Sequence, residues 1–194
     1  MRTASIERNT KETKIKLELE LDGTGSYEIQ TGVGFFDHML THIAKHGFLN
    51  LRIMAQGDLE VDAHHTVEDV GIVFGQALRK ALGEKTGISR YGDAVIPMDE
   101  ALALIALDLS GRPYLRFHAE LGKGKVGDFD LELVEEFFQA VAVQSGMNIH
   151  IRLLDGNNLH HCSEAIFKAF GRALAAAIKI DERVKGIPST KGVL

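Results

Sequence analysis

The chain has 194 residues, of which 45% are hydrophobic and 25% charged, an ordinary balance for a folded protein with a buried core. Its formal charge of −5, without a long basic run, argues against a nucleic-acid partner, because such binding needs clustered Lys and Arg. No stretch approaches the ~20 apolar residues that span a membrane, and the single cysteine excludes an intramolecular disulfide. We therefore expect a cytoplasmic protein with no membrane partner.

The opening residues have the pattern of strands. Residues 3–9 read as extended, and residues 13–21 alternate between apolar and charged side chains, as in a half-buried strand. A turn at 22–25 follows, and Tyr27 and Ile29 continue the alternation. This pattern predicts a hairpin between the second strand and the third segment.

Beyond residue 33, helical and strand-like periods alternate to the end of the chain. We expect, in order, a helix over 34–47, a strand over 48–56, a helix over about 64–83, strands over 93–97, 101–109 and 113–120, a helix over about 130–145, a strand over 148–154 and a helix over about 160–181. A Gly-rich, basic loop over 122–127 precedes the third helix, and no low-complexity linker interrupts the order.

The chain matches itself when displaced by 96 to 98 residues, which indicates an internal duplication. With an offset of 96, eight residues repeat: His64, His65, Glu68, Phe74, Gly75, Ala77, Leu78 and Ala81 fall on His160, His161, Glu164, Phe170, Gly171, Ala173, Leu174 and Ala177. With an offset of 98, the preceding strand aligns as well, Asn50 with Asn148. We therefore expect one catalytic domain of two pseudo-symmetric halves, about 1–92 and 93–194. Its fold class would be a two-layer α/β sandwich (α+β), with a sheet on one side and helices on the other.

Two His-His-x-x-Glu clusters are the clearest chemical signal. Each stands at the start of an expected helix: His64-His65 with Glu68, and His160-His161 with Glu164. On a helix, residues three or four apart share a face, whereas neighbours diverge by about 100°. The Glu therefore joins either His, but the two His are better placed to bind different metals. A single pair is more often a solvated helix start, yet its repetition in register favours a two-metal site suited to Mn, Fe, Zn or Ni.

A histidine stripe precedes the first cluster. His38, His42 and His46 recur every four residues on the first expected helix, opposite its apolar face. The 98-residue offset aligns His38 with Glu136, so we interpret both as metal ligands and His42 as a surface residue. Cys162 aligns with a Thr under the 96-residue offset, which favours a packing role.

Several longer motifs resemble those of the imidazoleglycerol-phosphate dehydratase family, over essentially the whole chain. The matching stretches are 21–25 (LDGTG), 34–40 (GFFDHML), 46–47 (HG), 57–58 (GD), 64–69 (HHTVED), 108–113 (DLSGRP), 160–161 (HH) through 168–170 (KAF), and 188–192 (PSTKG). One departure concerns Glu136, because many members have a His in the corresponding Val-Glu-His-Phe-Phe stretch. A carboxylate can replace an imidazole as a ligand, with a shift in affinity or metal preference.

The resemblance implies a fold, a reaction and an assembly. Each half would resemble domain 2 of ribosomal protein S5. The enzyme would be a carbon-oxygen lyase (hydro-lyase) of histidine biosynthesis that removes water from D-erythro-imidazoleglycerol phosphate and gives imidazoleacetol phosphate. The family binds the substrate ring as an imidazolate between two Mn(II) ions per active site, expels the hydroxyl through a diazafulvene-like intermediate, and removes a C–H proton with a carboxylate. The assembly would be a homo-oligomer of 24 subunits with shared active sites.

The family's functional residues carry over to positions of this chain. The implied metal ligands are His38, His64, His65, Glu68, Glu136, His160, His161 and Glu164. The implied catalytic carboxylates are Glu12, Glu68 and Glu164, and we choose Glu12 as the base. The implied contacts to the substrate and its phosphate are Glu12, His46, Arg90, Arg112, Lys168, Ser189 and Lys191.

Two other functions fit the clusters. A dinuclear metallohydrolase also uses two metals, and it would release inorganic phosphate, which a dehydratase does not. A non-enzymatic metal-binding protein also uses His clusters, but that function leaves Arg112, Lys168 and the Ser-Thr-Lys tail unexplained.

Overall fold

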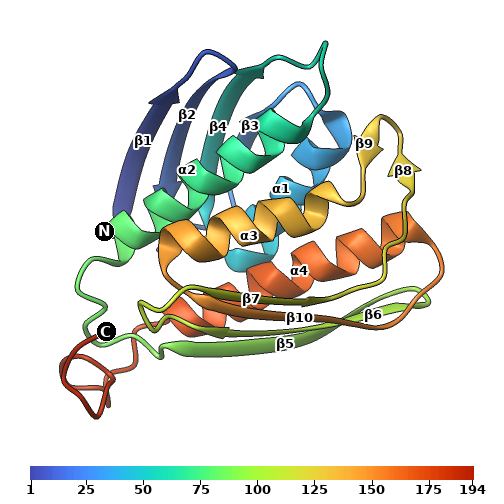
Figure 1. The fold of residues 1–194 in the computed structure, drawn as a ribbon. Coiled ribbons are helices and arrows are strands. Elements are labelled where there is room, and N and C mark those ends of the chain that lie inside the picture. The colour runs from blue at the N-terminus through green and yellow to red at the C-terminus, as the bar shows by residue number, and fades with distance from the viewer.

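The computed structural model describes residues 1–194 and has two four-stranded sheets on its outside with four helices between them (Figure 1). The first sheet contains, in spatial order, β1 (Thr3–Asn9), β2 (Thr13–Glu20), β4 (Asn50–Gly57) and β3 (Tyr27–Gln30). The second contains β5 (Tyr91–Met98), β6 (Ala101–Asp108), β10 (Asn148–Asp155) and β7 (Tyr114–His118). The helices are α1 (Gly34–Gly47), α2 (His64–Leu82), α3 (Leu133–Ser145) and α4 (Leu159–Ile178). A small hairpin consists of β8 (Lys125–Val126) and β9 (Phe129–Asp130).

The duplication is visible in the strand pairing. Arg8 of β1 pairs with Ile15 of β2, and Ile96 of β5 pairs with Ala103 of β6, so both members are displaced by 88 residues. The displacement grows to 98 at β4 and β10, because the second half has a longer connection, with β8 and β9, before its first helix. Each half is a sheet with helices on one face, so the expected duplicated two-layer fold is confirmed.

The helices of one half pack against the helices of the other, α1 on α4 and α2 on α3. Glycine makes this approach close. A Cβ added at Gly171 would lie 3.0 Å from the Ile43 carbonyl oxygen, and one added at Gly75 would lie 2.9 Å from the Val141 carbonyl oxygen. These two contacts are related by the duplication. They bring α4 against α1, and α2 against α3.

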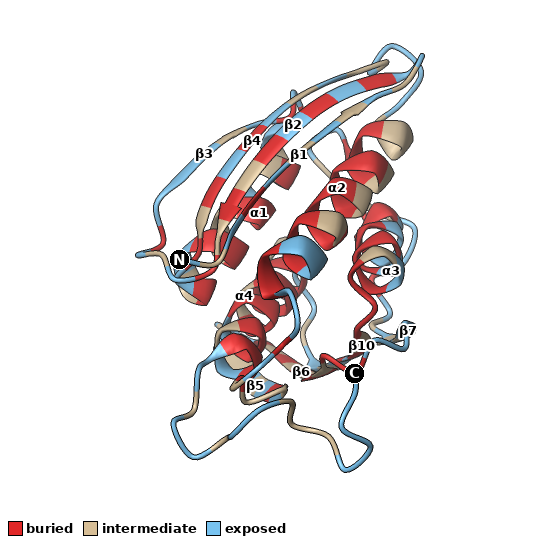
Figure 2. Cartoon of the chain, turned by 90° about the vertical axis from the view of Figure 1, so that its left-hand side faces the viewer, coloured by how far each residue is buried: buried red, intermediate tan, exposed pale blue.

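The core lies between the sheets and is shared by both halves. Figure 2 shows the buried residues on the helices and on the inner faces of the sheets. A chain of contacting aromatic rings crosses it: Phe36 meets Phe137, Phe137 meets Phe167, and Phe138 meets Phe170, with centroids 5.1 to 5.6 Å apart. Full burial of each such ring contributes about 2 to 3 kcal/mol, so the two halves depend on one another for stability.

Three sequence expectations need correction. β3 does not form a hairpin with β2, because it pairs in parallel with β4, which lies between them. That arrangement depends on a strand 20 residues further along, which the local alternation does not reveal. α3 begins at Leu133 rather than near 130, since the preceding residues form the β8–β9 hairpin, and α4 ends at Ile178 rather than near 181.

None of the helices combines the length and the apolar character that crossing a membrane requires.

Candidate active site

Three predicted ligands meet where the start of α4 packs on α1. The nearest ligand atoms of His38, His160 and Glu164 all lie within 4.8 Å of one another. The Glu164 Oε2 atom is 3.5 Å from His38 Nε2 and 3.3 Å from His160 Nε2. Glu164 is itself buried, whereas His38 is exposed, so the group forms an open-sided donor set at the surface.

His42 contacts this group, contrary to the expectation that it is a surface residue. Its side chain is 12% exposed, and its Nε2 lies 3.5 Å from Glu164 Oε1 and 3.2 Å from His38 Nε2. The four-residue spacing that placed His42 beside His38 also turned both toward α4. Burial lowers the pKa of His42 to about 4, against the attraction of Glu164, so the ring is neutral and able to ligate at neutral pH.

Glu164 is charged despite its burial. Desolvation would raise its pKa, but the hydrogen bond from Lys168 and the nearby imidazoles outweigh it and lower the pKa to about 2. The Lys168 Nζ atom lies 2.5 Å from Glu164 Oε1, so Lys168 is next to the donor set and positioned by it. His46 follows one turn beyond His42, with its ring stacked at 5.7 Å.

The second cluster begins α2 and includes an orienting carboxylate. His64 Nε2 lies 3.9 Å from Glu68 Oε2, and both side chains are exposed. His65 Nδ1 lies 2.9 Å from Oδ2 of Asp58, the residue that directly follows β4. The hydrogen bond to Asp58 raises the pKa of His65, and it leaves Nε2 of the ring free to bind an ion.

His161 has an equivalent partner from a different element. Its Nδ1 lies 2.8 Å from Glu100 Oε2, in the turn between β5 and β6, and this hydrogen bond raises the pKa of His161. The pKa of Glu100 falls to about 2, through the same bond and that from the Asn158 N–H. Sequence reasoning missed Asp58 and Glu100 as orienting residues. The Gly57-Asp58 motif was a signal for the first, but nothing local marked the second.

Glu136 on α3 is the counterpart of His38 on α1. By the duplication, Glu136 stands in the same relation to the α2 cluster as His38 does to the α4 cluster. His38 is five residues before Ile43, and Glu136 is five before Val141, the two residues that contact the paired glycines. Glu136 is exposed and forms no ion pair. Within one chain, the donor group of His38 does not include the α2 cluster.

Several implied phosphate contacts lie far from the His cluster. The Arg90 N–H donates to the carbonyl of Ala177, 17 residues after His160 on α4, so Arg90 is about 25 Å from the cluster at a rise of about 1.5 Å per residue. Its guanidinium binds Asp108, at 2.8 Å, and the Pro188 carbonyl, at 2.9 Å.

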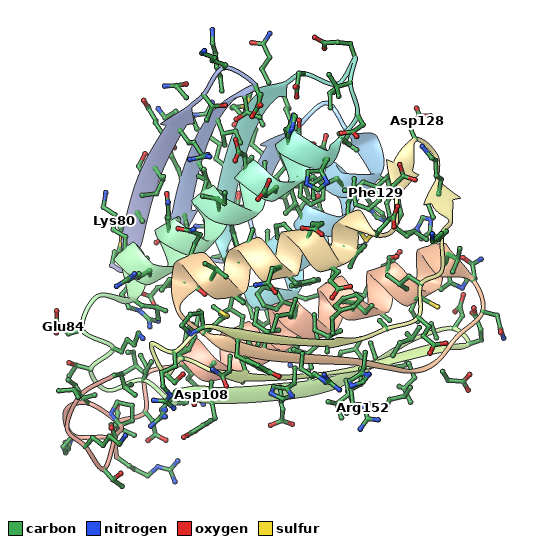
Figure 3. All side chains as sticks on the ribbon, in the orientation of Figure 1. Lys80, Glu84, Asp108, Asp128, Phe129 and Arg152 are labelled. Atoms are coloured by element: carbon green, nitrogen blue, oxygen red, sulfur yellow. The ribbon has the colours of Figure 1, made fainter.

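Three more of the implied phosphate residues, Arg112, Ser189 and Lys191, gather at that same distant end. Arg112 is 67% exposed, with a guanidinium nitrogen 4.0 Å from Asp108. The Lys191 N–H donates to the Ser189 hydroxyl in the C-terminal segment that Arg90 contacts. Figure 3 shows Asp108 beside this segment and Phe129 at the opposite end of the molecule. Phe129 packs on Phe35, which contacts His160, so the picture and the contacts agree.

Glu12 stands alone in the turn between β1 and β2. Its carboxylate is exposed and has no hydrogen-bond or ion-pair partner, although its N–H donates to the Thr10 hydroxyl at 3.1 Å. It lines the same surface hollow as Asp58. A free carboxylate beside a histidine cluster can act as a proton acceptor.

The fold and these clusters define a class, a duplicated α/β protein with a His/Glu group able to bind a metal. The family model for imidazoleglycerol-phosphate dehydratase matches residues 31–174, and the chain belongs to this family. It is therefore a hydro-lyase of histidine biosynthesis whose substrate is a phosphorylated imidazole, as the sequence motifs predicted.

Relatives match the whole chain, and solved structures match more than nine tenths of it. The chain is 61% identical to the dehydratase of Streptococcus mutans, over 100% of both chains, and 58% identical to that of Desulfitobacterium hafniense, over 100% of this chain and 99% of the relative. The crystal structure of the Staphylococcus aureus dehydratase has a TM-score of 0.84 at 47% identity, covering 92% of this chain and 99% of that one. The Pyrococcus furiosus structure has a TM-score of 0.84 at 41% identity, covering 97% and 100%.

Proposed function

We propose that the enzyme converts imidazoleglycerol phosphate to imidazoleacetol phosphate with two Mn(II) ions per active site. The observation that carries the proposal is the pair of pseudo-equivalent donor sets. One consists of His38, His160 and Glu164, whose ligand atoms are already gathered. The other, by the duplication, consists of His64, Glu68 and Glu136. Mixed imidazole and carboxylate donors fit Mn(II).

His65 and His161 would complete these sets from neighbouring subunits. Each ring is held through Nδ1 by a carboxylate, Asp58 or Glu100, and neither ring is among the ligand atoms that gather with His38 in the same chain. A carboxylate that holds the ring of a ligating His also raises the basicity of the other nitrogen. The arrangement supports exchange of these two ligands between chains.

When bound, the two ions would supply positive charge that lowers the pKa of the substrate's ring N–H. The protein's own groups do the rest. Glu12 accepts the proton from the carbon beside the departing hydroxyl, because its carboxylate is exposed and unpaired. The hydroxyl leaves as water, the proton that it takes up is balanced by the one that Glu12 accepts, and the resulting enol becomes the ketone. Lys168 is placed by Glu164 to attract the phosphorylated chain.

Shared sites also account for the distant phosphate residues. Arg90 and Arg112 lie near one end of α4, and His160 near the other. A substrate a few ångströms long cannot contact both ends of a helix that is about 30 Å long. We propose that Arg90, Arg112, Ser189 and Lys191 serve a site whose His cluster belongs to a neighbouring subunit. A closed assembly of 24 subunits would supply every site in this way.

The test is an assay of ketone formation from imidazoleglycerol phosphate with metal-stripped and Mn-loaded enzyme. We expect turnover only after loading, with two Mn(II) per chain by elemental analysis. Full activity of stripped enzyme, or one ion per chain at saturation, would contradict the two-metal proposal. Release of inorganic phosphate would instead support the metallohydrolase that the clusters alone also allow.

A further inference from the structure

An ion pair between the partly exposed Arg8 and the buried Asp69 connects α2 to the turn that carries Glu12. Asp69, 8% exposed in its side chain, lies 2.9 Å from Arg8 Nε of β1 and accepts a hydrogen bond from the Thr13 hydroxyl at 2.5 Å. Thr13 is 2% exposed and begins β2. Its N–H donates to Thr10, which also accepts from the Glu12 N–H. Both ends of the turn are thus fixed to α2.

In the second half, the corresponding contact between helix and strands is made by uncharged residues. By the 88-residue displacement Arg8 and Thr13 correspond to Ile96 and Ala101, and by the 96-residue displacement Asp69 corresponds to Ala165. Ala101 and Ala165 are fully buried, and Ile96 packs against the same core. Apolar residues therefore suffice to dock the helix on the strands. Since ion pairs contribute little net stability whether they are exposed or buried, the charged version in the first half needs a different explanation.

The two turns differ in what fixes their glutamates. Glu100 corresponds to Glu12, but its carboxylate binds His161 Nδ1 and the N–H groups of Asn157 and Asn158, so these bonds hold it in place. Glu12 has no such partner, because Asp58 takes the equivalent position on His65. An unpartnered carboxylate depends on its backbone for its position.

We propose that Asp69 is a positioning residue that fixes the β1–β2 turn, through Arg8 and Thr13, so that Glu12 meets the substrate in a constant place relative to the metal-binding start of α2. Asp69 directly follows Glu68 on that helix, so one residue joins the two parts of the site. The inference rests on the proposed role of Glu12. Misplacement of a catalytic group by about 1 Å costs up to about 100-fold in rate.

The test replaces these three residues of the first half with their counterparts from the second half. The triple variant Arg8→Ile, Thr13→Ala, Asp69→Ala should fold with a Tm within a few degrees of the parent and bind Mn(II) fully. Its kcat should fall at least about tenfold, with KM changed by less than about threefold. An unchanged kcat in the folded, loaded variant would overturn the proposal. Glu7→Gln, on the exposed face of β1, is the matched control and should leave kcat unchanged.

Two further variants keep the test decisive if the triple variant does not fold. Thr13→Val replaces the hydroxyl by a methyl group and should also lower kcat. Asp69→Asn should lower kcat in the parent but change it by less than about twofold in a Glu12→Gln background, because residues that act through one another are not additive. Multiplicative losses would show that Asp69 acts independently of Glu12. If Glu12→Gln alone leaves kcat unchanged, the proposed base is wrong, which is a separate result.

Discussion

The Glu100 carboxylate lies 2.8 Å from Nδ1 of His161, and Asp58 lies 2.9 Å from Nδ1 of His65. Two carboxylates from non-equivalent elements therefore perform the same task in the two halves. Each favours the tautomer with the proton on Nδ1, which leaves the lone pair on Nε2. The orientation of one His in each His-His-x-x-Glu motif thus depends on a carboxylate that lies outside the motif.

We predict that Glu100→Gln and Asp58→Asn each weaken Mn(II) binding by about 10- to 100-fold, the usual effect of removing a carboxylate behind a ligating His. Equilibrium dialysis with Mn(II) measures this without reference to turnover. Asp99→Asn is the control, since it makes the same charge change in the same turn, at 3.8 Å from His161 and with a 73% exposed side chain. Equal losses of Mn(II) affinity in Asp99→Asn and Glu100→Gln would show that only the negative charge matters, and not the hydrogen bond between His161 and Glu100.

Glu12→Gln should lower kcat by about 100-fold, the usual contribution of a general base, while metal content stays at the parent level. Glutamine keeps the size of the side chain but cannot accept the proton. A rise in KM with unchanged kcat would instead make Glu12 a binding residue. Glu60→Gln, which lines the same hollow, should have little effect on either constant.

The sequence predicted where the two His clusters lie because the duplication repeats them. Two His-His-x-x-Glu clusters in register identified both helix starts, and the offset of 98 paired His38 with Glu136. His42 was misjudged because a helical stripe does not state which neighbour covers it, and here α4 does. β3 was misassigned for a similar reason, since its partner β4 comes later in the chain. Contacts between distant segments are what local periodicity lacks.

Gly171→Ala and Gly75→Ala should each destabilise the protein by up to about 2 kcal/mol. An added methyl at either position meets a partner helix at 3.0 Å or closer, and overpacking of about 1 to 3 kcal/mol exceeds the gain in helix propensity of about 1 kcal/mol. Gly34→Ala is the control, because no atom lies within 4 Å of its Cβ position. Denaturant unfolding measures the three variants, and a stabilised Gly171→Ala would show that the helices separate readily.

The last prediction is that inactive variants with defects in different clusters restore one another. His65→Ala and His161→Ala should each lose metal and activity. If each site combines the α4 start of one subunit with the α2 start of another, co-assembly at equal amounts gives about a quarter of the sites a complete ligand set, since a closed assembly repeats one heterologous contact. Activity should therefore return on mixing after metal removal and reloading. His65→Ala mixed with Glu68→Ala, two defects in the same cluster, is the control and should stay inactive. Chelation should also lower the mass in solution, because binding that requires the assembly stabilises it. A fully active monomer, or no recovery with the first pair, would place each complete site within one chain.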